Sequence, residues 1–248
     1  MASFDMTLPR AWARVAGVCW VISIAGGMFA EVYVRAKLIA HDPATTIQNI
    51  LANEQTYRLG SAAEFVGTAV YLALTVILYR LLAPINRTVS LIAAFFSAAG
   101  CTMWMMNLVF DAAPLVFIAG TQAASGVPDQ TQSLTFALLK LHPEALILGM
   151  ICFGVQCLLL GYLIVRSTFL PKVLGALLAV GGVGYLVAGF THILSPTIAM
   201  QIGRYTFLPG EAAEVIMALW LTVIGVSAAK WKEAAGSMAG VKLGGANS

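Results

Sequence analysis

Three glutamates stand inside long apolar stretches of the chain, where a charged side chain is rare and usually functional. At about 1.5 Å per residue along a helix, each lies roughly 24 to 26 Å from the basic residue at the far end of its stretch. Similar depths on three helices predict that these carboxylates face one shared polar cavity. The candidate catalytic residues are Glu31, Glu64 and Glu214, with His192 near the cavity mouth.

A second group of residues is predicted to line the mouth of this cavity. By the same count His192 and Asp111 lie roughly 30 and 36 Å from the basic ends of their stretches. Asn107 precedes Asp111 by four residues, so the two share a helical face. Asp111, Asn107, Glu211 and Trp104 are therefore the candidate binding residues, although Trp104 also suits a bundle core and Glu211 a helix start after Pro209.

Three isolated charges could not face lipid together, because each costs about 2.5–3.5 kcal/mol at the bilayer centre. The carboxylates can pair with arginines, share protons, or coordinate a cation with His192. Glu31 has Arg35 four residues later, which also allows a local ion pair. The sequence leaves open whether a metal or a cofactor binds.

Composition defines the class of protein. Of the 248 residues, 60% are hydrophobic and only 10% are charged, whereas a soluble domain has about 25% charged residues. The chain is therefore predicted to be an integral membrane protein. No P-loop, zinc-protease or paired-histidine haem motif is present in the sequence, and no basic cluster with interleaved aromatics suggests nucleic acid.

The apolar stretches predict an all-α, polytopic helix bundle with six transmembrane helices, at about residues 11–34, 59–82, 88–120, 145–165, 172–192 and 209–230. Short interfacial helices are expected after Asp42 and within 121–140, and a loop at 195–208. Nine of the fourteen basic residues fall on the side of the termini, which predicts that both termini are cytoplasmic. We expect one membrane domain, 1–233, and a flexible cytoplasmic tail, 234–248.

Small residues four apart indicate where these helices touch. Gly175 with Ala179, and Gly184 with Ala188, have the spacing that lets two membrane helices approach closely. The fifth predicted helix is therefore expected to pack tightly against its neighbours.

Several segments resemble one bacterial membrane family. They are FGVQCLLLGYL (153–163), RSTFLPKVLG (166–175), GYL (184–186), AEVYVR (30–35) and LYRLLAPINR (78–87). The family is the domain of unknown function 4386 family, whose members often carry a basic residue where this chain has Ser97. The resemblance implies six helices in a bacterial inner membrane, and it brings no established reaction, cofactor or catalytic residue.

Three functions fit these residues. In the first, the outward-facing cavity binds or acts on an apolar small molecule or lipid, with one protonated carboxyl as acid and another as base or cation ligand. In the second, the same carboxylates couple protons or cations to small-molecule transport. In the third, the protein is a structural or regulatory subunit. Enzymatic activity and oligomeric state are open, and the expected partners are membrane lipid and an apolar ligand.

Overall fold

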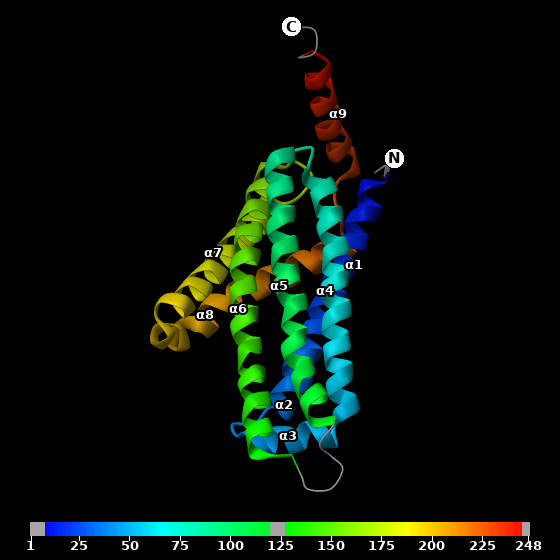
Figure 1. The fold of residues 1–248 in the computed structure, drawn as a ribbon. Coiled ribbons are helices and arrows are strands. Elements are labelled where there is room, and N and C mark those ends of the chain that lie inside the picture. The colour runs from blue at the N-terminus through cyan, green and yellow to red at the C-terminus, as the bar shows by residue number, and fades with distance from the viewer. Residues whose placement is uncertain (1–7, 120–126, 245–248) are drawn as a thin grey trace. The chain divides into compact units, whose positions relative to one another are not determined.

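A computed structural model describes residues 8–119 and 127–244, and every regular element within them is a helix (Figure 1). In chain order these are α1 (Pro9–Met28), a π-helical segment (Phe29–Arg35), α2 (Ala36–Leu38), α3 (Pro43–Ala52), α4 (Glu54–Leu82), α5 (Arg87–Ala119), α6 (Asp129–Arg166), α7 (Lys172–Leu194), α8 (Pro196–Val223) and α9 (Ala228–Gly244).

Six of the described helices are long and apolar enough to cross a membrane. The first of these spans, Pro9–Leu38, runs through α1, the π-helical segment and α2, and the others are supplied by α4, α5, α6, α7 and α8. The all-α prediction with six membrane-spanning helices is confirmed, and the chain is a multi-pass membrane protein.

The fourth span is longer than the sequence predicted. We expected an interfacial helix within 121–140 and a new helix after Pro143, but α6 is one helix of 38 residues with Pro143 inside it. Leu139 and His142, just before the proline, are both buried. Their packing holds the helix together across Pro143. Proline has no backbone N–H group to donate, and membrane helices commonly tolerate this loss. Residues 120–126 lie outside the described part of the chain.

The sixth span also begins earlier than predicted. A loop was expected at 195–208, but α8 runs from Pro196 through Pro209. The Thr206 hydroxyl donates to the Gly203 carbonyl oxygen at 2.8 Å within the helix. The backbone of Thr206 also packs against Gly184 of α7. These contacts favour helix over loop, so a proline was an unreliable sign of a helix start.

By their contacts the residues form two compact units. The first unit comprises Met1–Val21, Tyr71–Gly100 and Met150–Ser248, and the second comprises Ile22–Val70 and Cys101–Gly149. Helices α1, α4, α5 and α6 contribute residues to both units.

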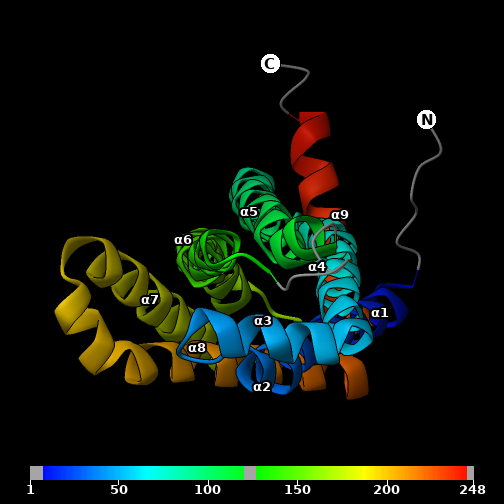
Figure 2. The same cartoon turned by 60° about the horizontal axis from the view of Figure 1, so that its bottom comes forward.

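The second unit has a small apolar core at the end of the first span. Val34, Leu38, Ile50, Tyr57 and Leu139 are all buried together there. Ile50 comes from α3, which lies close to α2 in Figure 2. This core fixes the segment that carries Glu31 and Arg35.

The start of α3 agrees with the prediction of a helix after Asp42. The side chain of Asp42 accepts a hydrogen bond from the Thr45 backbone amide at 2.8 Å. This N-cap satisfies one of the free amides at the helix start, and the same hydrogen bond lowers the pKa of Asp42.

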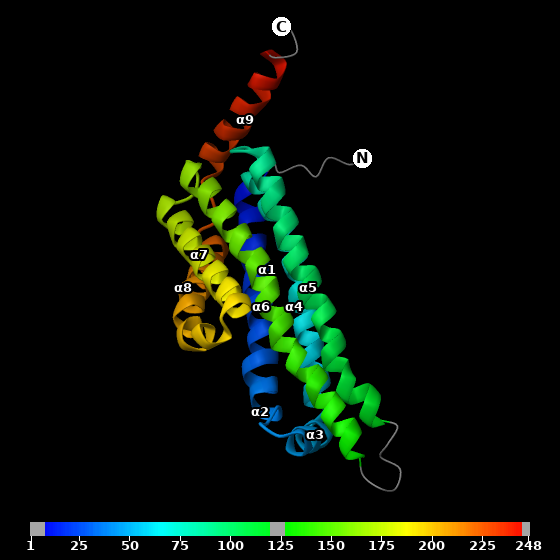
Figure 3. The ribbon, with the colours of Figure 1, turned by 60° about the vertical axis from the view of Figure 1, so that its left-hand side comes forward.

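In the first unit α7 packs along α8, as Figures 1 and 3 show. It also packs against α6, because a Cβ atom on Gly161 would lie 2.6 Å from the Gly175 carbonyl oxygen and 2.9 Å from Cβ of Ala179. The predicted close approach at Gly175 and Ala179 is thus confirmed.

Beyond α8 the chain forms another helix, α9, to Gly244. Part of the predicted tail, 234–248, is therefore helical, and residues 245–248 lie outside the described part. The flexibility of this segment and its side of the membrane stay predictions.

Candidate functional site

Arg35 is the centre of the largest group of ion pairs in the second unit. It ends the π-helical segment, in which Glu31 lies four residues earlier. The Arg35 Nη1 atom donates to Oε1 of Glu31 at 2.6 Å. The local ion pair that the sequence spacing allowed is therefore present. Segments of π-helix occur often at functional sites.

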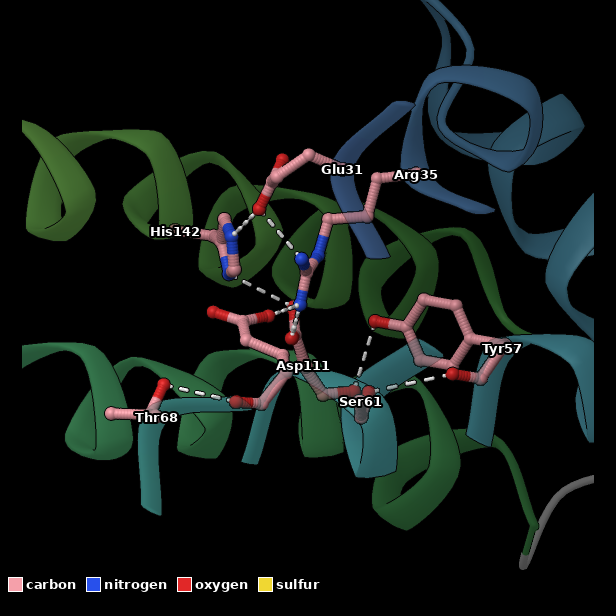
Figure 4. A network of polar contacts seen from close by, with 8 residues as sticks. Glu31, Arg35, Tyr57, Ser61, Thr68, Asp111 and His142 are labelled. Atoms are coloured by element: carbon pink, nitrogen blue, oxygen red, sulfur yellow. Dashed lines mark hydrogen bonds and ion pairs between the residues drawn. The ribbon is translucent and has the colours of Figure 1, made fainter. Parts of the chain in front are cut away.

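The same guanidinium binds carboxylates from two further helices (Figure 4). Its Nη2 atom donates to Oε2 of Glu64, on α4, at 2.5 Å. Asp111, on α5, accepts from Nη2 through Oδ2 and from Nε, at 3.3 Å, through Oδ1. Since each carboxylate comes from a different helix, one arginine holds three membrane-spanning helices together.

His142, on α6, completes the group. Its Nε2 atom lies 2.9 Å from Oε1 of Glu31, and its Nδ1 atom lies 3.0 Å from Oδ1 of Asp111. The imidazole therefore stands between two carboxylates of different helices, as Figure 4 shows. We call Glu31, Arg35, Glu64, Asp111 and His142 the ionic cluster.

Hydroxyl groups fix the backbone around the ionic cluster. The Tyr57 hydroxyl donates to the Asp111 carbonyl oxygen at 3.0 Å, and the Thr68 hydroxyl donates to the Glu64 carbonyl oxygen at 2.9 Å. Because Tyr57 is itself buried, its bond ties α4 to α5 at the level of Asp111. The two carboxylates are thus held by packed neighbours.

Access to the ionic cluster is uneven. The Glu31 side chain is 40% exposed, whereas those of Arg35 and Glu64 are 6% exposed, His142 3% and Asp111 1%. Glu31 is therefore the member through which the cluster reaches its surroundings.

The charges of the cluster do not balance. Three carboxylates face one arginine and one histidine. Even with a cationic imidazole one negative charge is in excess, and with a neutral imidazole two are. Because an uncompensated buried charge is strongly unfavourable, the cluster favours binding a proton or a cation.

The cluster also has donor atoms spaced as in a metal site. One oxygen each of Glu31 and Glu64 and a ring nitrogen of His142 all lie within 4.8 Å of one another. Arg35 already donates to both carboxylates, so a divalent ion would compete with a fixed positive charge. Sequence reasoning expected His192 as the imidazole ligand, whereas His142 is the histidine that faces these carboxylates.

The structure brings together some of the predicted site residues and not others. Glu31, Glu64 and Asp111 meet on Arg35. Asn107 and Trp104 belong to the same unit, where Asn107 is fully buried and the Trp104 indole donates to the Leu146 carbonyl oxygen at 3.3 Å.

The remaining predicted residues lie in the first unit. Glu214 accepts a hydrogen bond from the Trp20 indole at 3.0 Å, His192 is in the last turn of α7, and Glu211 is exposed within α8. Glu211 was expected in the first turn of a helix that begins after Pro209. It lies within α8 instead, so that expectation was wrong. A cavity shared by Glu31, Glu64 and Glu214 stays a prediction.

Sequence reasoning missed His142 and Tyr57. His142 was not among the predicted site residues, and the helix predicted at 145–165 began after it, but it is buried within α6. The signal that could have revealed it is the continuation of apolar residues on both sides of the proline. Nothing in the sequence marked Tyr57, because its partner is a backbone carbonyl.

Fold and site together define a multi-pass helical membrane protein that buries an ionic cluster among four of its spans. The chain belongs to the DUF4386 family, a domain of unknown function, whose model matches residues 15–225. Over 96 residues the chain is 38% identical to an uncharacterized protein of Archaeoglobus fulgidus. The matched region covers 37% of this chain and 56% of that protein. The match thus spans just over half of the relative. No solved structure matches the chain.

Proposed function

We propose that this protein is a proton-coupled membrane carrier of small molecules and that the ionic cluster is its proton-binding site. The observation that carries the proposal is the position of His142 between the accessible Glu31 and the buried Asp111. Histidine is suited to this role because an imidazole ring can accept a proton at one nitrogen and release a proton from the other.

The geometry supports a relay through the imidazole. A proton on Glu31 passes to Nε2 of His142. The proton on Nδ1 then passes to Asp111, so the ring returns to neutrality. Nδ1 lies 3.0 Å from Oδ1 of Asp111 without the alignment of a hydrogen bond, so the ring turns slightly for this step. Arg35 holds both carboxylates in place during this exchange, because it donates to each of them. The excess negative charge of the cluster supplies the driving force for taking up the proton.

The proposed location is the cytoplasmic (inner) membrane of a bacterial cell, with both termini in the cytoplasm. The supporting observation is the excess of basic residues on the side of the termini. In that orientation the ionic cluster takes its protons from the outer side.

The test is a pH jump on proteoliposomes adsorbed to a solid-supported membrane. The proposal predicts a transient current that scales with the amount of protein and is absent from empty liposomes, because proton binding moves charge. His142→Gln should remove the transient while the variant still inserts and folds. A wild-type trace equal to that of empty liposomes would contradict the proposal.

A second candidate function is binding of an apolar small molecule that carries one polar group. It is favoured by Asn107, which is fully buried and whose amide has no hydrogen-bond partner among the described residues. A bound ligand could satisfy this amide, and Trp104, three residues earlier, would supply an aromatic wall.

Membrane lipid is the proposed partner of the first unit. A groove of about 450 Å³ is lined by Leu8, Pro9, Arg10, Ala11, Arg14, Ala228 and Lys232. Its three basic side chains suit the phosphate of an anionic lipid. Native mass spectrometry after addition of phosphatidylglycerol should show adducts, and Arg14→Gln should reduce them.

A further inference from the structure

Glu214 lies in the first unit among side chains from three other helices. It is half-buried in the middle of α8. Its neighbours are Trp20 of α1, Cys157 of α6 and Tyr185 of α7, all of which are buried. None of these residues takes part in the ionic cluster.

The polar groups around this carboxyl group are neutral. The Trp20 indole donates to Oε2 at 3.0 Å, and the Cys157 thiol lies 4.0 Å from Oε1. The Tyr185 hydroxyl group also lies beside the carboxyl group. Its ring reaches this position because it lies over Gly210, one turn before Glu214, where a Cβ atom would be 2.8 Å from the tyrosine oxygen.

No lysine, arginine or histidine within the described residues forms an ion pair with Glu214. Arg10 and Arg14, on the helix that carries Trp20, donate instead to the carbonyl oxygens of Ile224 and Val223. The charged group that acts on Glu214 from its own helix is Glu211, which is also acidic. An ionised Glu214 would therefore have no countercharge.

We propose that Glu214 is a second proton-binding site, which carries its proton at rest and exchanges it independently of the ionic cluster. A carboxylate at membrane depth without a cation is costly, and protonation removes that cost. Trp20 can donate to either the neutral or the ionised group, so the surroundings accommodate both states without rearrangement.

A hydrophobic carbodiimide tests this proposal directly. The protonated carboxyl group adds across one C=N bond: its oxygen bonds to the central carbon, its proton moves to nitrogen, and no group leaves. The experiment treats the full-length protein in detergent with dicyclohexylcarbodiimide at pH 6 and pH 8 and locates the adduct by peptide mass spectrometry. We expect modification of Glu214, faster at pH 6, and none at this position in Glu214→Gln.

Two further measurements make the outcome decisive. In Glu211→Gln the Glu214 adduct should persist, and in Trp20→Phe the reaction should extend to higher pH, because the ionised form loses a donor. An unmodified Glu214 at both pH values, with exposed carboxyl groups reacting, would overturn the proposal. If the pH jump gave no transient current, the proposal for the ionic cluster would fail but the carbodiimide result would still stand, because Glu214 and its neighbours share no residue with the ionic cluster.

Discussion

Arg35 and Asp111 are joined by two hydrogen bonds although 76 residues separate them in the chain. Paired bonds between a guanidinium and a carboxylate are strong and directional. The pair fixes α5 against the π-helical segment, while Nη1 and Nη2 of the same guanidinium bind Glu31 and Glu64. Arg35 is therefore both the countercharge of the proposed proton site and the link between its helices.

Replacing Arg35 by methionine should destabilise the protein severely. Methionine resembles the aliphatic part of the arginine side chain but leaves three carboxylates facing one histidine. Loss of one partner of a buried ion pair costs about 3–5 kcal/mol. Unfolding in detergent, followed by intrinsic fluorescence, should show a clearly lower transition temperature.

The matched control is Arg58→Met. Arg58 pairs with Glu54 four residues earlier, and both side chains are largely exposed. Exposed pairs contribute only about 0–1 kcal/mol, so this variant should unfold almost as the wild type does. Equal losses in the two variants would mean that the cluster contributes no more to stability than a surface pair.

Replacing His142 by glutamine should slow proton exchange with the buried carboxylate by about 100-fold or more, because glutamine keeps a similar shape and hydrogen bonds but does not titrate. Stopped-flow measurements with a pH indicator provide the rate. His41→Gln is the control, because His41 is exposed and outside the spans. An unchanged rate in His142→Gln would remove the relay from the mechanism.

Two neighbouring glycines of α1 should respond oppositely to alanine. A Cβ atom on Gly26 would lie 2.7 Å from the Ala63 carbonyl oxygen, whereas one on Gly27 meets nothing within 4 Å. Gly26→Ala should cost about 1–3 kcal/mol through overpacking, and Gly27→Ala should gain about 0.5–1 kcal/mol through helix propensity. Thermal unfolding of both variants measures the difference. Similar stabilities would show that α1 does not approach α4 this closely.

Replacing Asn107 by leucine should stabilise the ligand-free protein by about 1–3 kcal/mol, because a buried amide without a partner is removed and the shape is retained. If a ligand uses this amide, native mass spectrometry of the wild type should show a bound molecule that Asn107→Leu lacks. Both expectations would be contradicted if Asn107→Leu were less stable than the wild type and native mass spectrometry showed the same bound molecules in the two proteins.

The helical fold could be predicted from the sequence because apolar length alone decides it. A run of uncharged residues such as 145–165 has no alternative to a helix in lipid. Helix ends at prolines were less predictable. The helices predicted at 145–165 and 209–230 begin at or just after Pro143 and Pro209, yet α6 and α8 continue through these prolines. Leu139 and His142 are buried before Pro143, and Gly210 and Ala213 are buried after Pro209.

The ionic cluster could be predicted only in part. Counting residues placed Asp111 roughly 12 Å further along its helix than Glu64, yet both accept bonds from one nitrogen of Arg35. The count assumed straight, parallel helices with basic residues at one level, and it ignored the reach of a long arginine side chain. Partners on different helices depend on rotation about each helix axis, which no single sequence specifies.

Infrared difference spectroscopy during a pH titration tests the central claim most directly, because a protonated carboxyl group has its own carbonyl stretching band. The account predicts a band that appears as the pH falls and that is lost or shifted in Asp111→Asn and Glu31→Gln, while Glu54→Gln leaves it unchanged. A wild-type spectrum whose carboxyl bands are the same as those of Asp111→Asn at every pH would contradict the claim that the ionic cluster binds a proton.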